Sequence, residues 1–189
     1  MRKVALVGHS YIRKLETLHR DRKIVFFYED VRFRAWSGTN CETLTRNVVG
    51  EILTWRPDVV FLQIGGNEIR PPNEEDWQTA YKRIADFIAH FQVEGIIIRI
   101  GEVMPRPRPW ERFGVTADDY STCRNSLNTR LKRWCRRNSP RMHVLTFRLE
   151  EFSDGRTRYP DGVHLDEDGV RRYWNVIVAG CRQALGLEQ

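Results

Sequence analysis

The sequence predicts an α/β fold with three layers, in which helices cover both faces of a flavodoxin-like, five-stranded parallel sheet. Short runs rich in Val and Ile alternate along the chain with longer segments whose apolar residues recur at helical spacing. Consecutive parallel strands need a crossover, usually a helix, so this alternation favours a parallel sheet. We expect the strand order 2-1-3-4-5 in one domain over residues 1–189, since this length suits a single core.

The first half of the chain contains three predicted strands and two predicted helices. The strands at 4–7, 24–28 and 59–64 are short apolar runs in which β-branched or aromatic residues are frequent. The helices at 11–19 and 41–55 carry apolar residues three or four positions apart, which places these residues on one face.

The second half continues the alternation to its end. Helices are predicted at 77–91, 120–138 and 166–185, and strands at 96–100 and 143–147. The Ser-Pro dipeptide after the second of these helices ends it, because the residue before a proline avoids the helical conformation.

Polar motifs follow the predicted strands or precede the last helix. In open α/β sheets, ligands bind beyond the carboxyl ends of the strands, so we expect these motifs to lie at one edge. The motifs are Gly8-His9-Ser10, the segments 37–40 and 65–68, the proline-rich loop 104–114 and the turn 159–164.

Ser10, Asp161 and His164 are the candidate catalytic residues. A serine hydroxyl is a weak nucleophile until a base accepts its proton, and a histidine base needs a carboxylate that holds the right tautomer. A single turn at Gly162 can bring the Asp161 carboxylate to one ring nitrogen of His164 while the other nitrogen faces outward. Alone, this segment would be interpreted as a simple turn that Asp161 caps.

Ser10, Gly38 and Asn67 are the candidate oxyanion-hole residues. In acyl transfer, negative charge develops on an oxygen, and hydrogen-bond donors arranged beforehand stabilise it. The backbone N–H groups of Ser10 and Gly38 and the side-chain amide of Asn67 can supply such donors, and Gly38 allows close approach because it lacks a Cβ. Taken singly, Gly38 would be interpreted as a turn residue and Asn67 as a capping residue.

Together these motifs resemble the SGNH hydrolase superfamily, the GDSL-type esterases and lipases. The four signature residues correspond to Ser10, Gly38, Asn67 and His164, in the family order. The resemblance implies a three-layer α/β/α fold and a Ser10–His164–Asp161 catalytic set. It also implies an oxyanion hole from Ser10, Gly38 and Asn67, no cofactor, and a single SGNH hydrolase-like domain over residues 1–189.

Two positions depart from the family pattern. His9 replaces the usual aspartate between the glycine and the serine, and Glu68 replaces the usual acid after the asparagine. Adjacent residues after a strand point apart, so we expect His164 to be the base and His9 to have a structural role.

Other catalytic and metal classes fit the sequence less well. The nucleophile elbow of α/β-hydrolases needs Gly-x-Ser-x-Gly, whereas Tyr and Ile follow Ser10. The sequence also lacks phosphate-loop and dinucleotide fingerprints. The remaining histidines have no partner at metal-ligand spacing, so we expect no metal.

Composition and charge bear on partners and location. The chain has 31 Lys and Arg against 25 Asp and Glu, a net charge of +6, and no apolar run approaches the length of a membrane span. Basic residues at 130–137 surround Trp134, but helical spacing places them mostly on a solvated face, which only weakly supports nucleic-acid binding. Four scattered cysteines and the lack of a signal-peptide pattern predict free thiols and a cytoplasmic or otherwise intracellular protein.

We therefore expect a serine esterase that hydrolyses short-acyl, acetyl-type esters of small molecules, lipids or carbohydrates through an acyl-enzyme on Ser10. Two alternatives stay open. The sequence also resembles the esterase domains encoded within some retrotransposons. The other alternative is a non-catalytic module of the same fold whose basic surface binds RNA or anionic lipid.

Overall fold

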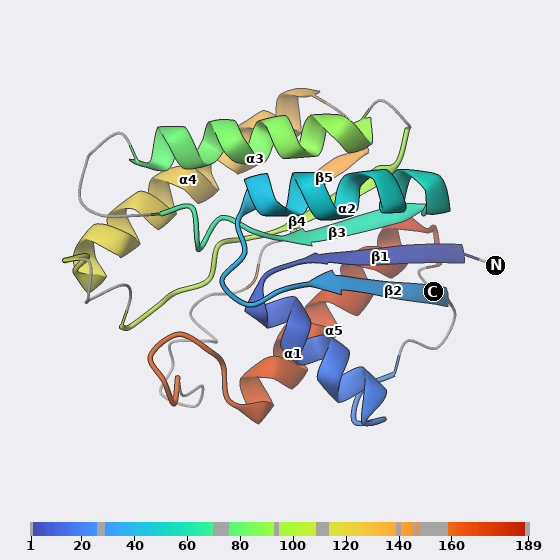
Figure 1. The fold of residues 1–189 in the computed structure, drawn as a ribbon, viewed down its shortest axis with the longest axis horizontal. Helices are drawn as coiled ribbons and strands as arrows, with labels where there is room; N and C mark the ends of the chain where they lie inside the picture. The colour runs from blue at the N-terminus through green and yellow to red at the C-terminus, as the bar shows by residue number, and fades with distance from the viewer. Residues whose placement is uncertain are drawn as a thin grey trace.

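Five parallel strands form a sheet in the order β2-β1-β3-β4-β5, which is the order expected from the sequence. The computed structural model describes residues 2–25, 29–69, 76–92, 95–108, 114–138, 141–145, 147 and 159–187. Helices lie on both faces of the sheet, so the described part of the chain forms three α/β/α layers (Figure 1). This arrangement confirms the predicted fold class.

The register of the sheet brings the ends of its first three strands to one level. The strands are β1 Arg2–Gly8, β2 Glu29–Ala35, β3 Val59–Gln63, β4 Ile97–Gly101 and β5 Met142–Leu145. Gly8 at the end of β1 lies beside Ala35 of β2 and Gln63 of β3. The loops that follow these three strands therefore leave the sheet at the same edge.

The second strand lies later in the chain than predicted from the apolar run at 24–28. Strand β2 begins at Glu29, and its buried residues Phe33 and Ala35 alternate with arginines. Because β2 is an edge strand, alternation with a period of two marks it, rather than a continuous apolar run. The prediction was wrong for this element, and residues 26–28 of the predicted run lie outside the described residues.

Five helices connect or follow the strands. They are α1 Ser10–Arg20, α2 Cys41–Trp55, α3 Asp76–Gln92, α4 Ala117–Asn138 and α5 Glu167–Ala184. Each matches a predicted helix, with the largest difference at the start of α4. Helices α1 and α5 cover one face of the sheet, and α2, α3 and α4 cover the other (Figure 1). In the part of the chain that the structure describes, no helix has the length and apolar character needed to cross a membrane.

Alternate side chains of β1 belong to two separate cores. Ala5 and Val7 pack among apolar side chains of α2, α3 and α4, whereas Val4 and Leu6 pack among those of α1 and α5. All four are fully buried. Burial on both faces explains why β1 is a continuous apolar run, and it fixes the strand end that leads to Ser10.

The four cysteines are free thiols, as their spacing predicted. Cys41, Cys135 and Cys181 are buried, and burial raises the pKa of Cys135 to about 11. The pKa of Cys41 is also raised, mainly by burial. A thiol that stays protonated at neutral pH is a poor nucleophile, so these residues act as small apolar core side chains.

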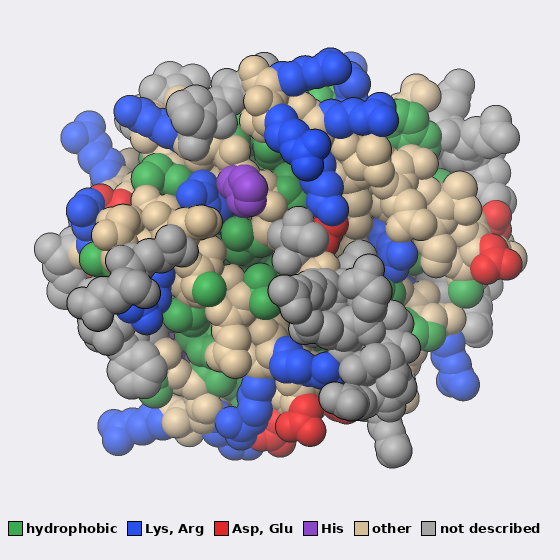
Figure 2. Space-filling model, turned by 180° about the vertical axis from the view of Figure 1, so that it is seen from behind, with side chains coloured by type: hydrophobic (Ala, Val, Ile, Leu, Met, Phe, Trp, Pro, Cys, Tyr) green, Lys and Arg blue, Asp and Glu red, His purple; other side chains and the backbone are tan. Residues whose placement is uncertain are grey.

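Lysine and arginine side chains are dispersed over the surface. Figure 2 shows them over much of one face of the molecule, with acidic side chains in fewer places. On α4, Arg130 lies over the Tyr81 ring at 5.0 Å, and Lys132 pairs with the buried Glu102, while Arg133 is exposed. Part of the positive charge is therefore used in contacts within the protein.

Candidate active site

Ser10 begins α1 directly after the turn at His9. The His9 carbonyl accepts hydrogen bonds from the N–H groups of Ile12 and Arg13, at 3.0 and 3.1 Å, which starts the helix. The Ser10 N–H is the first of the helix, a position that has no acceptor within the helix. The first turn of α1 contains no acidic residue, so the positive end of the helix dipole is left for a ligand or for a developing negative charge.

Asp161 and His164 face each other across a tight turn before α5. One carboxylate oxygen of Asp161 accepts hydrogen bonds from the backbone N–H groups of Val163 and His164, at 2.9 and 2.7 Å. The other carboxylate oxygen lies 2.5 Å from Nδ1 of His164. The turn therefore fixes the ring of His164 through both the backbone and the carboxylate.

The outer nitrogen of His164 reaches the candidate nucleophile. Its Nε2 lies 2.7 Å from the Ser10 hydroxyl oxygen. A carboxylate beside Nδ1 favours the tautomer with the proton on Nδ1, which leaves Nε2 as an acceptor for the hydroxyl proton. Asp161, His164 and Ser10 thus form one continuous hydrogen-bonded chain. His164 and Ser10 are 154 positions apart in the sequence.

Hydrogen bonds keep the Asp161 carboxylate ionised. Desolvation alone would raise its pKa, but the hydrogen bonds from the His164 ring and from the His164 and Val163 N–H groups outweigh this effect. The pKa of Asp161 therefore lies well below its usual range. A charged carboxylate at neutral pH is what an orienting partner of a histidine base requires.

Gly38 lies in the turn that follows β2. Its φ of +73° is in the left-handed region, which favours glycine, and the residue is exposed. The turn is held to β1 because the Trp36 N–H donates to the Gly8 carbonyl at 3.3 Å, and it closes through the Thr39 N–H, which donates to the Trp36 carbonyl at 3.4 Å. Gly38 is thereby kept near the strand end that leads to Ser10.

Asn67 lies in the turn after β3 and is almost completely buried. Its side-chain nitrogen donates to the Thr39 carbonyl at 2.7 Å, and its side-chain oxygen accepts from Nη2 of Arg106 at 3.0 Å. An amide nitrogen carries two protons, and Thr39 takes one of them. The loops after β2 and β3 are therefore joined at Asn67, next to the Gly38 turn.

Glu68 has a structural function that sequence analysis did not assign. Its buried carboxylate accepts hydrogen bonds from the Cys41 N–H at 2.7 Å and from the Gly65 N–H at 2.9 Å. Cys41 is the first residue of α2, where a negative charge interacts favourably with the helix dipole. Glu68 thus ties the start of α2 to the loop that carries Asn67.

His9 is buried and neutral. Its ring packs edge-on against Tyr11 with a centroid distance of 5.6 Å, and its Nδ1 has no hydrogen-bond partner among the described residues. Burial, with smaller contributions from the charges of Arg106 and His164, lowers the pKa of His9 to about 3. These observations support the structural role expected for His9 and leave His164 as the histidine in contact with Ser10.

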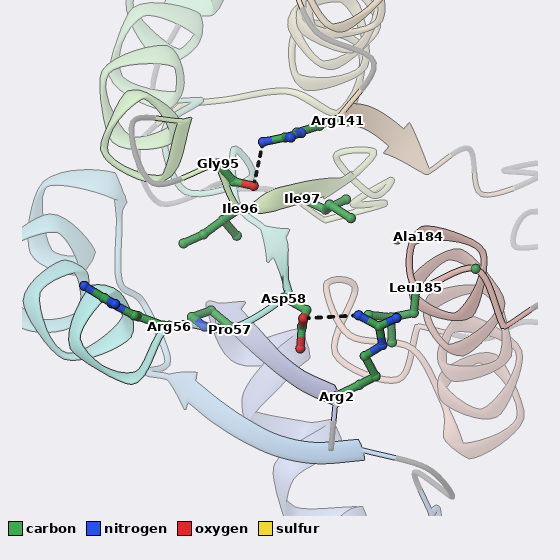
Figure 3. A pocket seen from close by; sticks show the side chains of 11 residues that line it. Arg2, Arg56, Pro57, Asp58, Gly95, Ile96, Ile97, Arg141, Ala184 and Leu185 are labelled. Carbon is green, nitrogen blue, oxygen red and sulfur yellow. Dashed lines mark hydrogen bonds and ion pairs between the residues drawn. The ribbon is translucent and has the colours of Figure 1, made fainter.

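A separate groove of about 650 Å³ lies at the opposite end of the sheet. Arg2 pairs with Asp58 at 3.5 Å, and Nη1 of Arg141 donates to the Gly95 carbonyl at 3.1 Å. Figure 3 shows both contacts. Its described lining contains no serine, cysteine or histidine, and α2 and α5 end there, so its arginines lie near the negative ends of helix dipoles. The described lining of the groove therefore offers no hydroxyl or thiol nucleophile and no histidine base.

The parallel sheet and the loops at its carboxyl edge form the arrangement that the resemblance to SGNH hydrolases implied. A family model, the GDSL-like lipase/acylhydrolase family, matches residues 7–172 of the chain. The protein belongs to this family and is a hydrolase, which confirms the resemblance noted from its sequence motifs. A comparison with curated proteins found no significant match to the chain.

Several solved structures have the same fold. A GDSL-like lipase from Bacteroides thetaiotaomicron is 15% identical, with a TM-score of 0.66 over 98% of this chain and 88% of the other. A carbohydrate esterase of family 3 from Talaromyces cellulolyticus is 17% identical, with a TM-score of 0.68 over 100% of both chains. The acetyl xylan esterase AlAXEase is 16% identical, with a TM-score of 0.62 over 94% and 98%. At these identities, the similarity establishes the fold alone.

Proposed function

We propose that the protein is a serine esterase that hydrolyses carboxylic esters through an acyl-enzyme on Ser10. The observation that carries this proposal is the hydrogen-bonded chain from Asp161 through His164 to the Ser10 hydroxyl. A nucleophile, a base and a group that orients the base are the three parts that this chemistry requires.

In the acylation step, the Ser10 hydroxyl oxygen attacks the ester carbonyl carbon while Nε2 of His164 accepts its proton. The resulting imidazolium is stabilised by the ionised Asp161 carboxylate. The C–O bond to the alcohol then breaks, and His164 returns the proton to the leaving alkoxide. The alcohol departs and the acyl group stays on Ser10.

Hydrogen-bond donors stabilise the tetrahedral intermediates of this step. The carbonyl oxygen becomes an oxyanion, and the donors assigned to it are the N–H groups of Ser10 and Gly38 and the second amide proton of Asn67. The Ser10 N–H acts at the positive end of the α1 dipole, which adds to its effect. Because these donors are fixed by the strand ends, little reorganisation is needed when the charge develops.

Deacylation uses the same groups with water in place of the serine. His164 takes a proton from the water, the hydroxide attacks the acyl carbon, and the Ser10 oxygen leaves with the proton that His164 returns. The products are the carboxylic acid and the regenerated enzyme. No cofactor enters either step.

We further propose an acetyl-type acyl group. The chain is small, and solved structures with the same fold include an acetyl xylan esterase and a family 3 carbohydrate esterase. A short acyl group needs little pocket volume beside the nucleophile. The alcohol portion is assigned no further than a small molecule, lipid or carbohydrate.

A panel of p-nitrophenyl esters of increasing acyl length tests the proposal. We expect the highest kcat/KM with the acetate, and no hydrolysis above background for Ser10→Ala. Ser121→Ala, which replaces a serine of α4, is the matched control and should keep the parental rate. Equal rates for Ser10→Ala and the parent would contradict the esterase proposal, and a preference for long chains would contradict the acetyl assignment. Salt-dependent RNA binding without hydrolysis would instead favour the non-catalytic alternative.

A further inference from the structure

We propose that Arg106 is a positioning residue for the esterase reaction, because it orients and polarises the side-chain amide of Asn67. The residue lies after β4, in the proline-rich loop 104–114 that the sequence placed at the ligand-binding edge of the sheet. The inference rests on the proposed function, in which Asn67 donates a hydrogen bond to the oxyanion.

The two partners of the Asn67 side chain allow only one orientation of its amide. A guanidinium group can only donate hydrogen bonds, and Arg106 lies 3.0 Å from the side-chain oxygen. A backbone carbonyl can only accept, and that of Thr39 lies 2.7 Å from the side-chain nitrogen. A flipped amide would place its N–H donors against the donors of Arg106 and its oxygen against the carbonyl oxygen of Thr39. The side-chain nitrogen is therefore fixed on the side of the Gly38 turn, with one proton left for a ligand.

The guanidinium group of Arg106 lies in a fitted and buried site. Arg106 is 5% exposed, and its guanidinium lies over the ring of the fully buried Tyr120, 5.6 Å from the centroid. On the other side it packs against Gly66, where a Cβ would lie only 2.6 Å from Nη2. A glycine directly before Asn67 thus makes room for the arginine. This fit leaves the guanidinium little freedom to move away from Asn67.

The segment that carries Arg106 is anchored at several points. The Asn128 side chain accepts from the Val103 N–H at 2.8 Å and donates to the Val103 carbonyl at 3.2 Å. The Tyr120 hydroxyl donates to the Met104 carbonyl at 3.1 Å. Farther along, the Arg108 N–H donates to the Gly162 carbonyl at 2.9 Å, in the turn that carries His164. The same segment therefore contacts both the oxyanion amide and the turn of the base.

The charge of Arg106 acts where the oxyanion forms. A charge-assisted hydrogen bond to the side-chain oxygen polarises the amide and strengthens the hydrogen bond that its N–H donates. An oxyanion accepts this stronger hydrogen bond more favourably than the neutral ester carbonyl does, so the polarised amide stabilises the transition state more than the ground state. Arg106 should therefore affect kcat rather than KM.

A double-mutant cycle with p-nitrophenyl acetate tests the inference. We expect Arg106→Met to lower kcat by about 10- to 100-fold and to leave KM nearly unchanged. Asn67→Ala removes the oxyanion donor itself, so its loss in kcat should be larger. Arg106→Lys should recover part of the loss, because it restores the charge without the forked geometry. The double variant Arg106→Met/Asn67→Ala should be no slower than Asn67→Ala alone, because Arg106 acts through Asn67. Arg133→Met, which replaces an exposed arginine of α4, is the control and should keep the parental kcat.

Two results would overturn the inference. The first is that Arg106→Met keeps the parental kcat although Asn67→Ala lowers it. The second is that the fold loss in kcat of the double variant equals the product of the fold losses of the two single variants. Melting temperatures identify any unfolded variant; if Arg106→Met does not fold, Arg106→Lys replaces it in the cycle. Failure of the esterase proposal is distinct, because Ser10→Ala would then be as active as the parent.

Discussion

The hydroxyl of Tyr11 donates a hydrogen bond to the carbonyl of Val163 over 2.7 Å, and so connects the helix that begins with Ser10 to the turn that carries His164. Lys14, one helical turn later, donates to the Leu165 carbonyl, also at 2.7 Å. These two contacts hold α1 against the C-terminal turn. They explain how a nucleophile near one end of the chain stays in hydrogen-bond contact with a base near the other.

Tyr11→Phe should loosen this connection. The variant leaves the Val163 carbonyl without its side-chain donor, so we expect about 1 kcal/mol less stability and a several-fold lower kcat. The matched control is Tyr159→Phe, since the Tyr159 hydroxyl is buried without a hydrogen-bond partner among the described residues. Thermal unfolding and ester hydrolysis measure both effects. A larger loss for Tyr159→Phe than for Tyr11→Phe would contradict this interpretation of the hydrogen bond.

Asp161→Asn should impair catalysis far more than stability. An asparagine oxygen can still accept from the Val163 and His164 N–H groups, but its side chain no longer provides the charge that stabilises the imidazolium. We expect kcat to fall by about 10³- to 10⁴-fold, as for other serine enzymes with this change.

Asp166→Asn provides the comparison for that variant. Asp166 caps α5 through the Gly169 N–H, and asparagine caps a helix about as well. This control should keep the parental kcat. If Asp161→Asn retained comparable activity in the same assay, Asp161 would not be the orienting group.

His9 should make the protein sensitive to acid. Its pKa in the folded state, about 3, lies below the ordinary value of 6.5, so the unfolded chain binds a proton first as the pH falls. Stability is therefore complete above pH 6.5 and is lost progressively as the pH falls toward 3. Between pH 7 and pH 5, His9 should account for a loss on the order of 2 kcal/mol in the free energy of unfolding.

Denaturant unfolding of His9→Asn at both pH values measures this effect. We expect His9→Asn to lose less free energy of unfolding between pH 7 and pH 5 than the parent does, whatever the stability of the variant at pH 7. His90→Asn replaces an exposed histidine of α3 and should lose as much free energy of unfolding between the two pH values as the parent. Identical differences for the parent and His9→Asn would contradict the assignment to His9.

Glu68→Gln should destabilise the fold around the site. A glutamine has one acceptor oxygen where the carboxylate has two, so either the Cys41 or the Gly65 N–H loses its buried partner. We expect a loss of about 1–3 kcal/mol, seen as a lower melting temperature. Glu51→Gln, which breaks an exposed ion pair with Arg34, should cost less than about 1 kcal/mol. Equal melting temperatures for the two variants would show that the Glu68 contacts contribute little.

The parts of the fold that follow from local pattern were predictable from the sequence. Strand β1 is a continuous apolar run, and helix α2 has apolar residues at helical spacing. The residues at the strand ends fall at one edge because the strands are parallel. The edge strand β2 was predicted too early in the chain, because the apolar run at 24–28 is a stronger signal than the alternation around Phe33. Ser10, Asp161 and His164 could be named because the chemistry requires those residue types, and because they follow the first strand or precede the last helix.

The supporting contacts of Glu68 and Arg106 could not be predicted in the same way. Both depend on which backbone groups and side chains meet once three or more loops have packed together. An arginine between prolines is typical of an exposed basic loop, yet Arg106 is buried against Gly66 and Tyr120. Burial of that kind has no periodic signal in the sequence.

The most direct test of the central claim is to locate the acyl group or its analogue on the protein. The intact protein is treated with a serine-directed fluorophosphonate, digested, and analysed by mass spectrometry. We expect one adduct, on the peptide that contains Ser10, no adduct on folded Ser10→Ala, and much slower labelling of His164→Ala. An adduct on a different residue, or unchanged labelling of Ser10→Ala, would contradict the assignment of Ser10 as the nucleophile.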